Sequence, residues 1–173
     1  MKDTIQLPDG VKAEIVGNEI KISGKLGETK KKFVEPDVKK EHHGNTILLS
    51  TVKESRKVKR IIKTYKSILK SMVAGVSKEF EYKMKIIFTH FPTTAKVEGN
   101  KLRIDNFLGE RAPRFAKIYP GVEIKVNKQD LVIKGIDLNS VSQTAGNIEQ
   151  TTRVVGKDRR IFQDGIYITE KAR

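Results

Sequence analysis

Apolar and polar residues alternate in two stretches of the chain that lie 82 positions apart. In residues 13–22 and again in residues 95–104, apolar side chains occupy every second position of two short arms, and a Gly-Asn pair separates the arms at Gly17-Asn18 and Gly99-Asn100. Alternation with a period of two is typical of half-buried strands, and a Gly-Asn pair favours a two-residue turn. Each stretch therefore predicts a β-hairpin.

The similarity between the two stretches extends beyond the hairpins at the same offset. Leu26-Gly27-Glu28 matches Leu108-Gly109-Glu110, and Phe33 matches Phe115. We expect Gly27 and Gly109 to end the second arm of each hairpin. Chance rarely gives two such matches in register, so the sequence predicts an internal duplication.

A strand and then a helix are predicted after each hairpin. The strands are residues 46–49 and 131–133, and the second helix covers residues 138–148 with a cap at Asp137 or Asn139. In the first half, Gly75 is expected to loosen or cap the last turn of the helix. The apolar stripe of that first helix has the spacing of three and four that a helix requires, at Val58, Ile61, Ile62, Tyr65, Leu69, Met72, Val73 and Val76.

These elements predict an α+β fold made of two tandem duplicated units. Each unit is a small, mostly antiparallel sheet with one helix packed on one face. Residues 80–92 alternate like a strand that joins the units. We place the first unit at residues 1–82, and the second, with a basic carboxyl-terminal tail, at residues 83–173.

The charge of the chain indicates a polyanionic partner. Its 173 residues contain 35 Lys and Arg against 21 Asp and Glu, a formal net charge of +14. The absence of Cys excludes disulfides, thiolate metal sites and cysteine catalysis. The amino end has no apolar segment typical of a signal peptide, and apolar runs are too short to span a membrane. We expect a soluble, intracellular protein.

Arginine is concentrated in the second half of the chain, which contains seven of the nine Arg residues. Because Arg grips phosphate with a planar fork, the second half is predicted to make the specific contacts, unless Lys and Arg simply drifted apart between the repeats. The first helix has a cationic polar face that either follows a phosphate backbone, is only solvated, or lies on an anionic membrane. Its cations are Arg56, Lys57, Lys59, Arg60, Lys63, Lys66 and Lys70.

Patterns for catalysis or cofactor binding are weak in this sequence. His42-His43 is better interpreted as part of a polar loop than as a metal site, because adjacent side chains point apart. His90 is a lone residue at a strand end, and the sequence contains no phosphate loop, dinucleotide fingerprint or nucleophile elbow. We therefore expect no enzyme activity, no catalytic residues, no metal and no cofactor.

The carboxyl-terminal segment combines cations with an aromatic residue. Lys157, Arg159 and Arg160 precede Phe162, which is a texture typical of RNA contacts, although the cations could also be solvated. A turn is predicted at Asp164-Gly165, followed by a closing strand at residues 166–168.

This segment resembles the carboxyl-terminal signature of the archaeal and eukaryotic members of a large-subunit ribosomal protein family, number six in bacterial naming and number nine in older eukaryotic naming. The matching positions are Gln150, Val154, Lys157, Arg160, Phe162, residues 164–168 and Lys171. The Tyr-Lys-Gly-Lys-Gly type of tail found in bacterial members is absent. The resemblance covers essentially the whole chain, because that family also consists of two duplicated α+β units, and it indicates an archaeal type.

The resemblance implies a structural constituent of the large subunit of the cytoplasmic ribosome. Members bind large-subunit (23S) rRNA, chiefly through the second domain, next to neighbouring ribosomal proteins and near the sarcin–ricin loop and stalk base, where translational GTPases dock. No membrane and no small-molecule substrate is implied. A non-ribosomal RNA-binding or RNA-chaperone protein is the alternative, followed by a nuclease and a membrane-surface protein.

The predicted rRNA-binding residues form three groups in the second half. The loop after the second hairpin contributes Arg111, Arg114 and Lys117. The tail contributes Arg153, Lys157, Arg159, Arg160, Lys171 and Arg173. A weaker candidate is the hairpin itself, with Lys96, Lys101 and Arg103.

Overall fold

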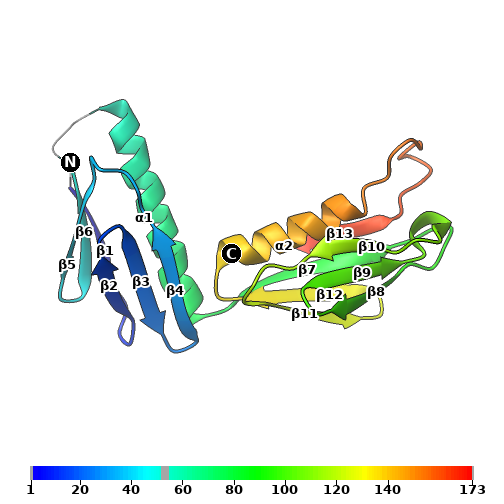
Figure 1. Ribbon diagram of the computed structural model, residues 1–173, viewed down its shortest axis with the longest axis horizontal. Helices are drawn as coiled ribbons and strands as arrows, with labels where there is room; N and C mark the ends of the chain where they lie inside the picture. Colours follow the sequence, from blue (N-terminus) through cyan, green and yellow to red (C-terminus); the bar gives the residue numbers. More distant parts are fainter. Residues whose placement is uncertain (1, 52–54, 173) are drawn as a thin grey trace. The chain divides into compact units, whose positions relative to one another are not determined.

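The computed structural model describes residues 2–51 and 55–172, and it divides into two compact units. The first unit ends at Glu79 and the second begins at Phe80. The boundary from the sequence was placed after Tyr82, within the strand that opens the second unit. Each unit has its own sheets and its own helix (Figure 1).

The first unit contains two antiparallel sheets and one long helix. The sheets have the orders β2-β3-β4 and β1-β6-β5. The elements are β1 (Lys2–Gln6), β2 (Lys12–Val16), β3 (Glu19–Gly24), β4 (Gly27–Lys32), β5 (Lys39–His43), β6 (Thr46–Ser50) and α1 (Arg56–Ser77).

The second unit repeats this arrangement and adds a strand from the tail. Its sheets have the orders β10-β9-β8 and β11-β12-β7-β13. The elements are β7 (Phe80–Ile87), β8 (Thr94–Glu98), β9 (Lys101–Asp105), the 3-10 turn η1 (Phe107–Gly109), β10 (Arg114–Lys117), β11 (Val122–Asn127), β12 (Asp130–Gly135), α2 (Leu138–Thr151) and β13 (Gly165–Glu170). The α+β fold and its duplication are thus confirmed.

Both predicted hairpins are present with their turns in the expected place. Ile15 lies opposite Ile20 in the first, and Val97 lies opposite Leu102 in the second. Gly17 has φ of 58° and Gly99 has φ of 56°, in the left-handed region that favours glycine. Local alternation and turn chemistry were sufficient to predict these elements.

The ungapped continuation of the repeat beyond the hairpins is wrong. Lys32 lies opposite Glu19, and Lys117 lies opposite Lys101, the residue that matches Glu19. The second unit therefore has three extra residues before this point, in the connection around η1. That connection contains Arg111 and follows the second hairpin.

The corrected register changes the partner of Phe33. The Phe33 N–H donates to the Asn18 carbonyl, as the Ile118 N–H donates to the Asn100 carbonyl. Phe33 and Ile118 are both buried, whereas Phe115 is 48% exposed. Phe115 is consequently a surface residue rather than the equivalent of a core residue.

Gly75 does not cap the last turn of α1. The helix begins after Ser55, whose hydroxyl accepts a hydrogen bond from the Val58 N–H, and it continues through the buried Gly75 to Ser77. A Cβ at Gly24 would lie 2.9 Å from the side chain of Val76. Because Val76 must pack against Gly24 in this way, the helix is kept intact past Gly75.

The cap of α2 lies at Asp137, one of the two predicted positions. Its carboxylate accepts hydrogen bonds from the backbone N–H groups of Asn139 and Ser140. We predict that Asp137→Ala lowers the free energy of unfolding by about 1 kcal/mol, because these N–H groups lose their acceptor. Urea denaturation checks this, with the exposed Gln143→Ala on the same helix as the control; an equal loss in both variants would contradict the capping role.

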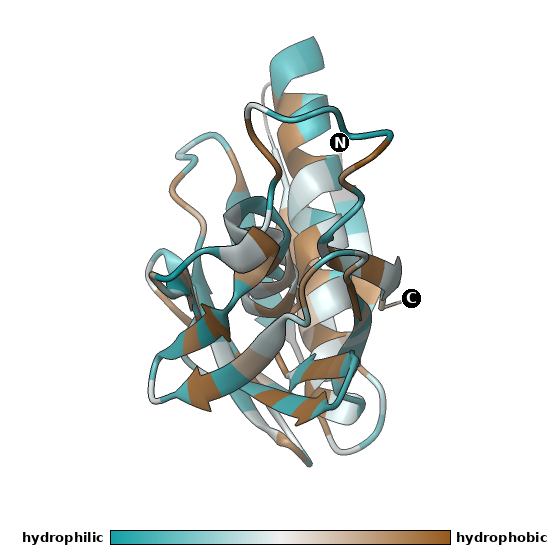
Figure 2. Cartoon of the chain, turned by 90° about the vertical axis from the view of Figure 1, so that its right-hand side faces the viewer, coloured by the Kyte–Doolittle hydropathy of each residue, from teal (hydrophilic) through white to brown (hydrophobic). Residues whose placement is uncertain are grey.

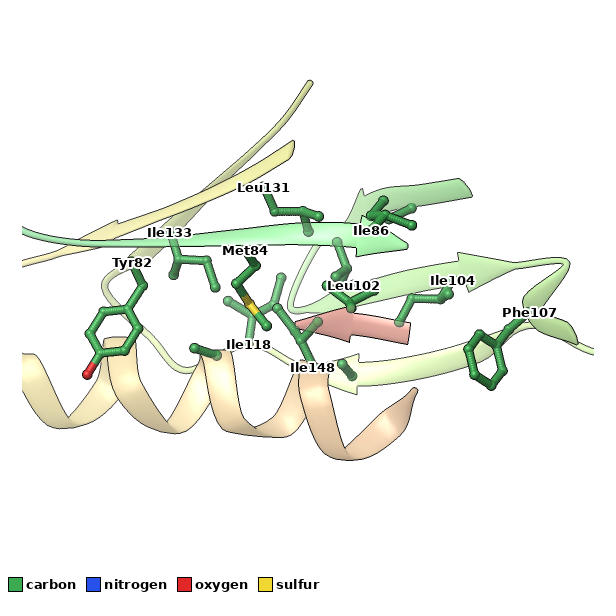
Figure 3. Close-up of a cluster of buried hydrophobic side chains, with 14 of the residues drawn as sticks. Tyr82, Met84, Ile86, Leu102, Ile104, Phe107, Ile118, Leu131, Ile133 and Ile148 are labelled. Carbon is green, nitrogen blue, oxygen red and sulfur yellow. The ribbon is translucent and has the colours of Figure 1, made fainter. Parts of the chain in front are cut away.

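The core of the second unit lies between its sheets and α2. Along β7, residues alternate between buried and more exposed positions. Figure 2 shows alternating hydrophobic (brown) and hydrophilic (teal) residues along strands of the chain. Tyr82, Met84 and Ile133 extend from the sheet toward α2, where Ile148 completes the contact (Figure 3). The predicted strand at 80–92 ends at Ile87 and is an inner strand of this unit rather than a joint between units.

Candidate nucleic-acid interface

Three loop segments meet at one end of the second unit. They are residues 88–93, 106–114 and 151–164, which together we name the loop end (Figure 1). The Asn106 side-chain amide donates to the Pro92 carbonyl at 3.1 Å. A Cβ at Gly109 would lie 3.2 Å from the ring of Phe91. The first two segments are therefore packed against each other.

Arg114 connects the second of these segments to the third. Its guanidinium donates to the Thr151 carbonyl at 2.7 Å, pairs with the carboxylate of Glu110 and lies 4.4 Å from the ring centroid of Phe107. The hydrogen bonds from Arg114 hold the pKa of Glu110 below its usual range, against the opposing effect of burial. Arg114 was predicted in a loop, but it begins β10, and its planar fork is used within the protein.

Asp164 connects the third segment to the first. The carboxylate is completely buried and accepts a hydrogen bond of 2.8 Å from the Thr89 N–H, with the ring Nδ1 of His90 at 3.4 Å. Burial raises the pKa of Asp164, but the Thr89 and His90 hydrogen bonds outweigh it, and the net shift is downward. The predicted turn at Asp164-Gly165 is wrong, because the Asp164 carboxylate is buried and β13 already begins at Gly165.

An aromatic stack supports the basic part of the tail. The ring of Phe162 stacks on His90 with 4.9 Å between centroids, and the Lys157 ammonium lies 4.5 Å from the centroid of Phe162. Asp158 accepts a hydrogen bond from the Arg160 N–H, which fixes a local turn. The expected pairing of a tail cation with Phe162 is therefore present.

The loop end exposes several cations while its acids are engaged within the protein. Glu110 binds Arg114, Asp158 caps the Arg160 N–H, and Asp164 binds the 88–90 segment. The exposed cations are Arg111, Arg153, Lys157, Arg159 and Arg160. Arg153 and Arg159 also share the lining of a pocket between the end of α2 and the tail. This arrangement concentrates positive charge on a pre-formed surface.

The sheet β10-β9-β8 has an outer face that combines Lys residues with an exposed aromatic ring. Phe115 lies opposite Arg103, and Lys101 lies opposite Lys117, with the Lys101 ammonium 5.8 Å from the centroid of Phe115. Lys96 lies opposite Arg103 on the neighbouring strand. The sequence did not single out Phe115, because the ungapped repeat equated it with a buried residue.

Two of these cations have intramolecular partners that the sequence did not indicate. Arg103 forms ion pairs with Asp105 at 2.9 Å and with Glu98 at 3.3 Å. The Lys117 ammonium lies 5.5 Å from the ring centroid of Tyr119. Lys117 is the last residue of β10, so its predicted loop location is wrong.

Lys171 is separated from the other tail cations. β13 is antiparallel to β7 with Gly165 opposite Ile87 and Glu170 opposite Lys83, so Lys171 follows the far end of the strand. The length of β13 places it roughly 20 Å from the loop end. Arg173 lies outside the described residues.

The basic face of α1 in the first unit is largely exposed. Lys66 forms an ion pair with Asp3 of β1. The exposed cations of this face are Arg56, Lys57, Lys59, Arg60, Lys63 and Lys70. Within residues 2–51 and 55–172, no helix is long enough and apolar enough to cross a membrane.

The predicted polar loop at His42-His43 is wrong, since residues 39–43 form β5. The alternation needed for a strand is hidden there, because the segment is almost entirely polar. Among the residues that the structure describes, no group of three His, Cys, Asp or Glu side chains could hold a metal ion.

Comparison with known proteins supplies the identity of this fold. The family model described as ribosomal protein L6 matches residues 7–79 and 91–165, one segment in each unit. The chain belongs to the ribosomal protein L6 family. The resemblance seen in the carboxyl-terminal segment is thus confirmed over both halves.

Archaeal relatives named large ribosomal subunit protein uL6 match nearly the whole chain. The protein of Ignicoccus hospitalis is 43% identical over 169 residues, covering 95% of this chain and 91% of its own length. That of Methanothrix thermoacetophila is 41% identical over 167 residues, covering 96% and 95%. That of Picrophilus torridus is 44% identical over 164 residues, covering 95% and 91%.

Membership of the L6 family establishes the general role of the chain. It is a structural constituent of the large ribosomal subunit, where its partners are rRNA and other ribosomal proteins, and it is not an enzyme. The RNA-binding protein outside the ribosome and the nuclease are thereby set aside.

Proposed function

We propose that this L6 protein binds large-subunit rRNA mainly through the loop end of its second unit, near the sarcin–ricin loop and the stalk base where translational GTPases dock. The location on the rRNA is what the family resemblance implies. The observation that carries the proposal is the exposure of five cations on one pre-formed surface whose acids are engaged elsewhere.

The cations of the loop end have two proposed roles, according to whether the side chain is exposed or held by other groups of the protein. Arg111, Arg153, Arg159 and Arg160 are exposed and present forks suited to phosphate. Lys157 adds charge from above the Phe162 ring. Arg114 has a supporting role in this proposal, because its guanidinium is held by Glu110 and Thr151.

The outer face of the sheet β10-β9-β8 is a second, weaker part of the proposed interface. Lys96, Lys101 and Lys117 are exposed there around the ring of Phe115, and an exposed aromatic ring can stack on an unpaired base. Arg103 orients this face through its ion pairs. Lys171 and Arg173 are proposed to make contacts separate from those of the loop end.

We predict that the double variant Arg159→Ala with Arg160→Ala weakens rRNA binding and flattens its salt dependence. The slope of log K against log salt is negative, and loss of two phosphate contacts should reduce its magnitude by about one to two units. The measurement is binding to a large-subunit rRNA fragment containing the sarcin–ricin loop, repeated at several salt concentrations.

The control is Lys85→Ala with Lys125→Ala, which removes the same charge from exposed positions on β7 and β11 of the same unit. Equal effects of the two double variants would mean that general charge rather than the loop end governs binding. Chemical footprinting of the intact protein on deproteinised rRNA tests the location; protection away from the sarcin–ricin region would overturn that part of the proposal.

A further inference from the structure

The two units differ at one edge of the corresponding sheet. In the second unit, β13 runs antiparallel to β7 on the side opposite β12 (Figure 1). In the first unit, β1 pairs antiparallel with β6 as β7 does with β12, and β1 is the end of the sheet order β1-β6-β5. Among the residues that the structure describes, the edge that the tail covers in the second unit is therefore an outer edge in the first.

A groove follows this edge of the first unit. It is lined from β1 by residues 4–6 and from α1 by Lys66, Lys70 and Val73. The second unit shows what fits such a place, because β13 lies along β7 and packs against α2. A strand is thus the shape that the fold already accepts between these two elements.

The chemistry of the groove matches an extended peptide with an acidic side chain. An edge strand presents backbone N–H and C=O groups at regular spacing, which another strand pairs and a nucleic acid does not. Ile5 and Val73 provide apolar contact, while Lys70 is exposed and Lys66 is occupied by Asp3. The charge available to a partner therefore lies at Lys70.

We propose that the outer edge of β1 and its groove bind an extended segment of a neighbouring large-subunit protein, which adds antiparallel to β1 and places an acidic side chain at Lys70. This surface lies in the first unit and is independent of the rRNA interface proposed above. In the second unit the chain supplies the equivalent strand itself; in the first unit the strand comes from the partner.

The test is a photo-crosslinking residue at position 4, replacing the exposed Thr4 in the full chain assembled into the large subunit. We expect a crosslink to one ribosomal protein, within a segment containing Asp or Glu. Lys70→Glu should reduce its yield about fivefold, because reversal of the charge repels the acid. Lys63→Glu on the same helix, exposed and outside the groove lining, should leave the yield unchanged.

Several outcomes would overturn this proposal. They are a crosslink to rRNA, a crosslink within the chain itself, the absence of any crosslink, or equal loss in both Lys variants. Hydrogen exchange of the unmodified protein provides a second measurement that requires no variant to assemble. Amides of β1 should exchange more slowly in the subunit than in the free protein, and unchanged exchange would also contradict strand addition.

Discussion

Replacing Asp164 with alanine is expected to destabilise the second unit by about 3 kcal/mol, because a buried carboxylate that accepts hydrogen bonds from Thr89 and lies beside His90 is lost. The carboxylate is completely buried and holds Thr89 and His90 against the tail. Without it, the Thr89 N–H lacks its acceptor, and residues 88–93 and 151–164 are left with the stack of His90 on Phe162 as a contact between them. Urea denaturation followed by a probe in the second unit measures the effect.

Asp164→Asn should cost about half as much as the alanine variant, since the amide oxygen can still accept from Thr89 while the charge is lost. The control is Asp130→Ala in the same unit, which removes an exposed carboxylate and should change stability by less than about 0.5 kcal/mol. If Asp164→Ala matched this control, Asp164 would not hold the loop end together.

The same residue predicts a pH dependence with a defined sign. The pKa of Asp164 is lower in the folded protein than its ordinary value, so folding stabilises the charged carboxylate relative to the protonated acid. Its contribution to stability is complete above the unfolded pKa of about 4 and is lost as the pH falls through the folded pKa. The stability difference between the wild type and Asp164→Ala should therefore shrink below pH of about 4, and a difference that grew there would contradict the assignment.

Replacing Arg114 with alanine is expected to cost about 2 kcal/mol of stability, because a hydrogen-bonded guanidinium packed on an aromatic ring is lost. The Thr151 carbonyl loses its 2.7 Å donor, Phe107 loses its cation and Glu110 loses its ion pair. RNA affinity should fall as well, because Arg111 and Arg153 lie on the two segments that Arg114 joins. Denaturation and RNA binding of the same variant measure both effects.

The neighbouring variant Arg111→Ala distinguishes a residue that contacts RNA from one that stabilises the loop end. Arg111 is exposed, so its loss should leave stability within about 0.5 kcal/mol while RNA binding weakens. The pKa of Glu110, measured by nuclear magnetic resonance, should rise toward its ordinary value in Arg114→Ala and stay low in Arg111→Ala. An Arg114→Ala protein with unchanged stability and an unchanged Glu110 pKa would mean that its fork is available to RNA.

Sequence periodicity determined the elements whose shape depends on near neighbours. Both hairpins were predicted from a period of two, and α1 and α2 from a helical spacing of three and four. The cap of α2 lies at Asp137, one of the two predicted positions. These signals act within a few residues of the chain. The polar strand β5 escaped prediction, and Gly75 lies within α1 instead of capping it. In those places the tertiary contacts outweigh local preference, as the packing of Val76 on Gly24 shows.

The tail shows most clearly what the sequence could and could not supply. Its pattern of cations and aromatic residue indicated the family and an RNA-binding surface, and the comparisons confirm the family. The sequence did not reveal that Arg114 is used internally or that Asp164 is buried under residues 88–90. Both depend on residues more than thirty positions away, which no local pattern encodes.

The sequence by itself thus determined the duplication, the fold class and the family, since these are recorded in local patterns and in residue identity. The tertiary structure decided which cations share a surface: Arg111 and Arg159 lie in segments of the loop end, whereas Lys171 follows the opposite end of β13. It also decided that β13 covers one sheet edge while β1 leaves the equivalent edge as a groove. Strand pairing between distant segments fixes these positions, and its register emerges only when the whole chain folds.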